Sequence, residues 1–304
     1  MNYQRISILG CGWLGFPLAC RLVAEDHFVR GSTTTKENIP MLEEAGIEPY
    51  YVRLDPRING DDVVSFFDVD TVVLNIPPPR VEDRISFMLQ QGEELINRLN
   101  APSVKRLVMV SSTSVYGSGN QDADETDSHL PETENGKGLI AMEKQLMEGL
   151  KASVAVVRMA GLIGPGRNPG RFLSNRSTHG QDVAGGESNK DAANTDVKGK
   201  RAGGKNISGN GEEPVNLIHL EDAIGVVTAL IRQPELTGVF NACAQNHPTR
   251  KEFYIQASSK QGFALPVFTD RAPRPWKRVI SNKIRESSGY HFVYDDPIDA
   301  LKDL

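Results

Sequence analysis

The residues with the clearest chemical potential are three glycines near the N-terminus, Gly10, Gly12 and Gly15, spaced as G-x-G-x-x-G. In that pattern the first glycine allows a tight turn, the second lets a pyrophosphate approach the backbone, and the third lets a helix pack on a strand. The N-terminus of the following helix offers unpaired N–H groups and a positive dipole end, which attract phosphate. A strand-like segment at 5–9 precedes the turn, as dinucleotide binding requires. The alternative is an ordinary glycine-rich strand–helix turn.

The choice of dinucleotide depends on the residues about 20 positions further along the chain. Proteins that bind NAD usually place Asp or Glu there, where the acid binds the ribose hydroxyls. Here the stretch 30–36 reads RGSTTTK and contains no acid. Because hydroxyl groups and a lysine can hydrogen-bond a 2′-phosphate that a carboxylate would repel, the sequence favours NADP, with NAD as the alternative. The predicted ligands in this stretch are Ser32, Thr33, Thr34 and Lys36. The alternative is a polar loop that contacts only solvent.

The elements that must position these residues alternate between strand and helix over the first 160 residues. After the strand at 5–9, short apolar segments with strand character lie at 28–34, 48–54, 71–76, 106–111 and 153–159. Apolar residues at helical spacing run between them, most clearly over 83–100. Such alternation predicts a parallel sheet covered by helices on both faces. The expected fold class is α/β, with a Rossmann-type doubly wound parallel sheet and a smaller C-terminal α/β substrate lobe.

The predicted domain boundaries follow from this pattern. We expect residues 1–160 to form a dinucleotide-binding domain, which is completed by residues from about 220 to 244. Residues 161–219 and 245–304 are expected to form the substrate-binding lobe. Residues 174–213 hold eight glycines and three large aliphatic residues, too little apolar surface to offset the entropy of ordering. We therefore predict a flexible insertion there. Its cations, which either face solvent or contact an anionic ligand, are Lys198, Lys200, Arg201 and Lys205.

The composition narrows the class of protein. With 34 Lys and Arg against 39 Asp and Glu, the formal net charge is −5, which argues against nucleic acid or an anionic membrane as the main partner. The three cysteines have no metal-ligand spacing and cannot form a disulfide framework, so they indicate a reducing compartment. No apolar run approaches the ~18 residues of a membrane span, and no signal peptide precedes the first strand. We expect a cytoplasmic globular protein without a metal site.

A second group of motifs begins at the end of the strand at 106–111. Residues 111–117 (SSTSVYG) are similar to the S-S-x-x-V-Y-G segment of the extended short-chain dehydrogenase/reductases, the superfamily of nucleotide-sugar epimerases and dehydratases. Residues 158–166 (RMAGLIGPG) resemble its R-x-x-x-x-Y-G-P-G turn, and residues 216–223 (NLIHLEDA) resemble its V-H-V-x-D segment. Together with 75–79 (NIPPP) and Ser281-Asn282, these motifs are most similar to the atypical YeeZ-like branch, over nearly the whole chain apart from the insertion.

The sequence departs from this superfamily in its catalytic pair. Reductases of the superfamily use Tyr-x-x-x-Lys, in which the lysine lowers the pKa of the tyrosine so that it can exchange a proton near neutrality. None of the seven tyrosines here has a lysine four positions later. In the register of the superfamily, the pair falls on Asn135 and Leu139, with the usual later acid at Glu143. The standard hydride-transfer apparatus is therefore missing.

The resemblance places Ser112 where the superfamily orients its substrate, at a strand end where open α/β sheets bind ligands. A hydroxyl that caps a local amide is the alternative for Ser112. Tyr116 is the nearest phenol and the second candidate catalytic residue, although it has no cation beside it in the sequence to lower its pKa. His219 can act as acid or base for the substrate, or can instead anchor a strand-to-helix turn. The arginines predicted to bind a phosphate or carboxylate of the substrate are Arg158, Arg167 and Arg171.

These expectations define a single candidate site. The further residues that we assign to the cofactor are Trp13, Leu14, Asn75, Ile76, Pro77 and Ser111. The predicted function is that of an NAD(P)-binding oxidoreductase or epimerase-like protein that acts on a small polar substrate. A non-catalytic NADP(H)-binding sensor is the main alternative, and a nucleotide-sugar epimerase that uses NAD is a third. The expected partners are a small-molecule substrate and a second copy of the chain in a homodimer.

Overall fold

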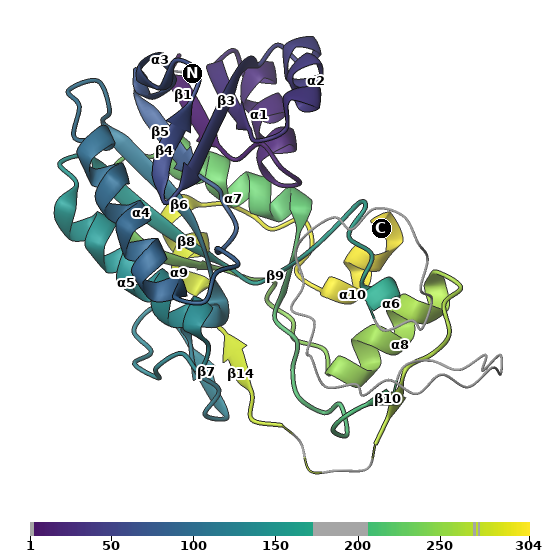
Figure 1. Cartoon of the computed structure of the whole chain (residues 1–304). Helices are drawn as coiled ribbons and strands as arrows, with labels where there is room; N and C mark the ends of the chain where they lie inside the picture. Colours follow the sequence, from purple (N-terminus) through teal and green to yellow (C-terminus); the bar gives the residue numbers. More distant parts are fainter. Residues whose placement is uncertain (1–2, 173–205, 270–271, 273) are drawn as a thin grey trace.

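The computed structural model describes residues 3–172, 206–269, 272 and 274–304 (Figure 1). An eight-stranded sheet with the order β12-β8-β6-β5-β1-β2-β3-β4 forms its centre. The strands are β1 Arg5–Leu9, β2 Phe28–Thr33, β3 Glu48–Asp55, β4 Arg57–Gly60, β5 Thr71–Leu74, β6 Arg106–Ser112, β8 Ser153–Met159 and β12 Gly238–Ala242. All neighbouring pairs are parallel except β3 and β4. The strand order reverses at β1, so the sheet is doubly wound and the predicted fold class is confirmed.

Helices cover both faces of this sheet. They are α1 Gly15–Ala24, α2 Ile39–Glu44, α3 Val63–Phe67, α4 Arg84–Leu99, α5 Glu134–Gly149 and α7 Leu220–Arg232. Helices α4 and α5 lie side by side on one face, and α1 and α7 contact each other on the other face (Figure 1). Because both faces are covered, the central strands are apolar throughout, and all four residues of β5 are buried.

The C-terminal part of the chain builds a smaller lobe beyond the carboxyl ends of the strands (Figure 1). Its helices are α6 Pro169–Phe172, α8 Arg250–Lys260 and α10 Pro297–Ala300, whereas α9 Asn282–Ser288 packs against β12 and α7 of the sheet domain. Short parallel strand pairs join distant segments: β9 Gly161–Ile163 with β11 Leu217–His219, β10 Asn206–Ile207 with β13 Val267–Phe268, and β7 Gln121–Ala123 with β14 Lys277–Val279. A second apolar core, which includes Ile163, Leu217 and Phe253, lies within this lobe.

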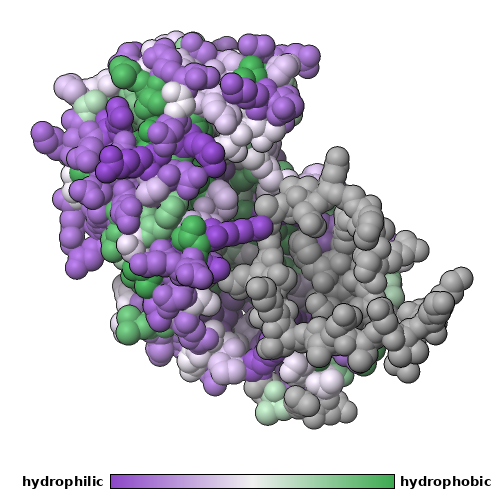
Figure 2. All heavy atoms as spheres, in the orientation of Figure 1, coloured by the Kyte–Doolittle hydropathy of each residue, from purple (hydrophilic) through white to green (hydrophobic). Residues whose placement is uncertain are grey.

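The predicted insertion at 174–213 is described only from residue 206 onward, where β10 pairs with β13. The cations predicted there, Lys198, Lys200, Arg201 and Lys205, lie outside the described residues. In the described part of the chain, no helix has the length and apolar character needed to cross a bilayer. Hydrophilic side chains predominate over the sheet domain on the face shown in Figure 2, with apolar side chains in small groups between them.

Candidate functional site

The glycine turn between β1 and α1 has the tight geometry that its spacing predicts. Gly10 has φ +108°, in the region that favours glycine, and a Cβ atom there would lie 2.2 Å from the carbonyl oxygen of Asn75. A Cβ atom at Gly15 would lie 2.1 Å from the carbonyl oxygen of Gly10, so the start of α1 packs directly on the turn. The Asn75 side-chain amide donates a hydrogen bond of 2.9 Å to the same carbonyl. Asn75 therefore fastens the end of β5 to the turn.

Gly12 differs from its two neighbours because it faces open space. The residue is exposed, and a Cβ atom built on it would meet no atom within 4 Å. The N-cap of α1 is Leu14, whose side chain cannot accept a hydrogen bond from the first N–H groups of the helix. The Phe16 N–H bonds to the Gly12 carbonyl at 2.9 Å and Pro17 has no N–H, so the N–H groups without a partner among the described residues are those of 12–15, beside the open space. The residues present fit a pyrophosphate held against the backbone at Gly12.

The hydroxyls at the end of β2 divide into two groups. Ser32 is buried, and its Oγ accepts a hydrogen bond of 2.8 Å from the N–H of Gly10. Thr33 is also buried, and its Oγ1 bonds to the backbone of Thr35. Thr34 and Lys36 are exposed, and the ammonium of Lys36 lies 5.1 Å from the centre of the Tyr51 ring. Of the four predicted ligands, Thr34 and Lys36 have side chains at the surface, whereas Ser32 and Thr33 support the local backbone.

A buried polar chain runs across the carboxyl ends of β6, β8 and β12. The Ser111 hydroxyl donates to the carboxylate of Glu143 on α5. The same carboxylate accepts from Arg158 of β8, with an Nη2–Oε2 distance of 2.7 Å. Arg158 Nη1 donates to the Tyr116 hydroxyl at 2.8 Å, and that hydroxyl donates to Oδ1 of Asn241 at 2.7 Å.

This buried polar chain of side chains contains three residues with predicted roles: Ser111 for the cofactor, Tyr116 for catalysis and Arg158 for the substrate. Arg158 is a cation in contact with Tyr116, which sequence spacing did not place there. Burial nevertheless raises the pKa of the Tyr116 phenol above its ordinary value, because desolvation outweighs the nearby guanidinium. Glu143, which the superfamily register gave only as a later acid and not as a site residue, accepts from both Ser111 and Arg158. An acid on the inner side of an amphipathic helix was the signal that could have identified it.

Ser112 occupies the end of β6 and is half-buried. Its Oγ accepts a hydrogen bond of 3.1 Å from the N–H of Ser114 and so caps the short 3-10 turn Thr113–Val115. In the described part of the chain, its own hydroxyl proton has no acceptor within hydrogen-bond distance. Ser112 is therefore both a local cap and a free donor at the strand end.

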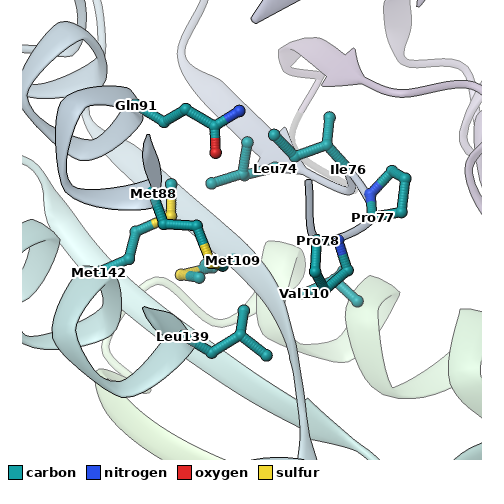
Figure 3. Close-up of a pocket in the computed structure, with 10 residues that line it drawn as sticks. All are labelled: Leu74, Ile76, Pro77, Pro78, Met88, Gln91, Met109, Val110, Leu139 and Met142. Atoms are coloured by element: carbon teal, nitrogen blue, oxygen red, sulfur yellow. The ribbon is translucent and has the colours of Figure 1, made fainter. Parts of the chain in front are cut away.

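Asn135 and Leu139, the positions where the superfamily register predicts the catalytic pair, lie on α5. The Asn135 side chain accepts a hydrogen bond of 3.2 Å from Arg84. Leu139 lines a small apolar pocket between α4, α5 and the ends of β5 and β6 (Figure 3). The other residues that line it are Leu74, Ile76, Pro77, Pro78, Met88, Gln91, Met109, Val110 and Met142. The predicted cofactor residues Ile76 and Pro77 thus border an apolar pocket where the superfamily carries its lysine.

The remaining predicted residues are Trp13, Arg167, His219 and Arg171. The Trp13 indole N–H donates a hydrogen bond of 2.8 Å to the Pro165 carbonyl, and the Arg167 guanidinium lies 4.6 Å from the centre of the Trp13 ring. His219 is the N-cap of α7, where Nδ1 accepts from the N–H of Glu221. Burial lowers the pKa of His219, which keeps its ring neutral at pH 7. Arg171 lies in α6, and the structure describes only its backbone.

Comparison with known proteins shows what the whole chain is similar to. No family model matches the chain. Protein YeeZ of Escherichia coli (strain K12) is 32% identical over 298 residues, which cover 97% of this chain and 98% of YeeZ.

Similar solved structures share the fold at lower identity. UDP-N-acetylglucosamine 4-epimerase from Bacillus cereus has a TM-score of 0.72 and 15% identity, with 99% of this chain and 94% of that chain covered. The Bordetella bronchiseptica enzyme WbmG in complex with NAD has a TM-score of 0.72 and 18% identity, with 99% and 93% covered. A functionally unknown conserved protein from Silicibacter pomeroyi DSS has a TM-score of 0.73 and 20% identity, with 98% and 97% covered. At these identities the likeness shows the fold.

Proposed function

The chain belongs to the YeeZ-like branch of the extended short-chain dehydrogenase/reductases, and we propose that it is an NADP(H)-binding oxidoreductase or epimerase of atypical type. The observation that carries this proposal is the turn at Gly12, where open space meets backbone N–H groups that have no partner among the described residues. Structures of this fold that contain NAD, such as WbmG, support the same class of ligand. When bound, a nicotinamide dinucleotide supplies or accepts the hydride.

The residues that would select NADP stand at the end of β2. Thr34 and Lys36 are exposed beside the turn, and no acid occupies residues 30–36 to repel a 2′-phosphate. The hydroxyl of Thr34 can donate a hydrogen bond to that phosphate, and the ammonium of Lys36 adds a charge-assisted one. Ser32 acts differently, because it holds the N–H of Gly10 and so fixes the turn on which the pyrophosphate would rest.

Ser112 is the residue that we expect to orient the substrate. Its Oγ already accepts from Ser114, so its proton is the part of the hydroxyl left for a substrate oxygen. A donor at a carbonyl or hydroxyl oxygen aligns the reacting carbon and stabilises negative charge that develops on the oxygen. The polarity of this strand end therefore supports a small substrate that carries a carbonyl or hydroxyl group.

The proton that accompanies hydride transfer needs a different source from that of ordinary reductases. The Tyr116 hydroxyl is held between Arg158 and Asn241, and burial raises its pKa, so this phenol is a poor acid near neutrality. His219 is buried and caps α7, which also disfavours it. These arrangements favour a water molecule or the substrate itself as the proton source. Arg158 is paired with Glu143 and bonded to Tyr116 in the buried polar chain, which argues against its predicted role in substrate binding.

The first experiment titrates nucleotide-free protein with NADPH, NADH, NADP and NAD by isothermal titration calorimetry. We expect micromolar binding with a preference for the two phosphorylated cofactors, and a reduced preference in Lys36→Ala. Protein with cofactor bound is then offered carbonyl compounds, alcohols and nucleotide sugars, while nicotinamide absorbance and epimerised products are followed. If none of the four dinucleotides binds, the proposal is wrong.

A non-catalytic NADP(H) sensor is the second candidate function. The observation that favours it is the apolar pocket at Leu139, where a reductase would carry its lysine (Figure 3). Ser112→Ala separates the two functions: in an enzyme it abolishes turnover and leaves the Kd for NADPH unchanged. A sensor binds NADPH equally well in both forms and converts no substrate of the panel.

A further inference from the structure

Arg167 is a cation that the rest of the described chain leaves without a counter-charge. It follows the turn Gly164–Gly166, and its backbone N–H closes that turn by donating to the Gly164 carbonyl at 2.9 Å. Its side chain is half-buried. Among the described residues, the guanidinium has no carboxylate within 4.0 Å and donates no hydrogen bond. Most of the other arginines of the chain differ, since they are paired with an acid or bonded to a carbonyl, as Arg30, Arg98 and Arg106 are.

The position of this cation is fixed by Trp13. The guanidinium lies 4.6 Å from the centre of the indole ring, within the range of a cation–π interaction. The indole in turn donates to the Pro165 carbonyl at 2.8 Å, so Trp13 joins the glycine turn to the turn at 164–166. Trp13 directly follows Gly12, and the open space at Gly12 is the proposed pyrophosphate-binding site. The cation is therefore held against the side chain of the residue that follows Gly12 in the glycine turn.

The desolvation of the Arg167 guanidinium also favours a bound anion. Taking a guanidinium out of water costs free energy unless a negative charge or hydrogen-bond acceptors replace the water. Burial lowers the pKa of Arg167, and no neighbouring carboxylate in the described part of the chain offsets that effect. Stacking on Trp13 recovers part of the cost but satisfies none of the N–H groups of the guanidinium fork. An anion with several acceptor oxygens would satisfy them, and a phosphate has the matching geometry.

We propose that Arg167 is a phosphate-binding residue that contacts the pyrophosphate of a dinucleotide held at Gly12. The inference rests on the proposed function and adds to it, because it moves Arg167 from the substrate to the cofactor. The pyrophosphate then has two partners, the N–H groups of the glycine turn and the guanidinium of Arg167. Trp13 is the positioning residue, because its indole ring holds the Arg167 guanidinium next to the glycine turn.

The test compares Arg167→Gln with the unchanged protein by isothermal titration calorimetry against ADP-ribose, ADP and adenosine. If Arg167 contacts the pyrophosphate, the Kd for ADP-ribose and ADP rises by about tenfold or more, the loss expected for a charge-assisted hydrogen bond. The Kd for adenosine, which has no phosphate, stays within about twofold. Arg167→Lys keeps the charge without the fork, so its loss is smaller. The matched control is Arg98→Gln, which removes a surface arginine of α4 paired with Glu94.

The other outcomes are distinguishable. Equal affinities of Arg167→Gln and the unchanged protein for ADP-ribose and ADP overturn the inference and leave the proposed function standing. An equal loss for all three ligands also overturns it, because that result indicates a disturbed adenosine site. Failure of the unchanged protein to bind any dinucleotide overturns the proposed function itself.

Discussion

At the scale of single residues, Gly10 and Gly12 provide a matched pair that separates folding from binding. Gly10 has positive φ and no room for a side chain, whereas Gly12 faces open space. We expect Gly10→Ala to lower the free energy of unfolding by about 2 kcal/mol or more, because both backbone strain and a clash with Asn75 oppose it. Gly12→Ala should leave that free energy within about 0.5 kcal/mol and weaken NADPH binding by roughly tenfold or more.

Urea denaturation and calorimetric titration of the two variants measure these quantities. The interpretation of the turn as a pyrophosphate site would be wrong if Gly12→Ala bound NADPH as tightly as the unchanged protein. It would also be wrong if both glycine variants lost stability and affinity in the same proportion.

The thiols give a second prediction at this scale. Burial raises the pKa of Cys11 and of Cys243 to about 12 in each case, whereas Cys20 is only half-buried. Because the thiolate is the reactive form, iodoacetamide at pH 8 should modify Cys20 first and leave Cys11 and Cys243 intact until the protein unfolds. Both buried thiols keep their protons in the native state at a pH where the unfolded chain loses them. Stability should therefore be complete below pH ~8 and fall as the pH rises above ~9.

Mass spectrometry of alkylated native protein, with the same reaction in urea as a reference, locates the modified cysteines. Fast alkylation of Cys11 in the native state would show that the glycine turn opens readily, contrary to its packed geometry.

At the scale of elements, the buried polar chain joins α5 to the ends of three strands. Glu143 is 1% exposed and neutralises Arg158, so its removal leaves a buried guanidinium without a counter-charge. We expect Glu143→Ala to lower the free energy of unfolding by about 3–5 kcal/mol. The double substitution Glu143→Leu with Arg158→Met should recover much of this loss, because two apolar side chains of similar volume remove both charges together.

Chemical denaturation of Glu143→Ala, of the double variant and of the unchanged protein measures these free energies of unfolding. Glu148→Ala, which breaks an exposed pair with Lys144 on the same helix, is the control and should change stability by less than about 1 kcal/mol. A cost for Glu143→Ala no larger than that of the control would contradict the assignment of a buried, essential ion pair.

The elements also show how far the sequence determines the fold. The strand predicted at 153–159 has exactly the bounds of β8, and those at 28–34 and 48–54 differ by one residue from β2 and β3, because apolar, β-branched runs identify buried strands locally. The antiparallel strand β4 was not predicted, since its residues RING have no apolar run. The pairing of β7 with β14 joins residues 156 positions apart, which no local pattern encodes.

The site divides in the same way. The glycine spacing predicted the turn because backbone sterics act locally. The role of Ser32 depends on the register of β2 beside the turn, which places its hydroxyl under the N–H of Gly10. The partner of Arg158 lies on a different element, so sequence alone left this arginine as a substrate ligand. Polar residues were thus correctly placed at the strand ends, while their partners depended on tertiary contacts.

At the scale of the whole molecule, the candidate site draws on segments from both parts of the chain. The glycine turn belongs to the sheet domain, and the turn at 164–166 leads into the smaller lobe, with Trp13 in contact with both. A ligand between them therefore stabilises the folded arrangement as a whole. Any ligand that binds the native state alone adds RT ln(1 + [L]/Kd) to the free energy of unfolding, about 2.7 kcal/mol at 100 times Kd.

We accordingly expect NADPH at 100 times its Kd to raise the melting temperature of the protein by several degrees, measured by differential scanning calorimetry. NADH at the same concentration should raise it less, because it lacks the phosphate that Thr34 and Lys36 are placed to bind. Gly12→Ala should melt like the unchanged protein without ligand and show little of the shift with NADPH. An equal shift from adenosine would indicate that the pyrophosphate adds nothing, which the open turn at Gly12 argues against, as does Arg167, a cation with no acid partner among the described residues.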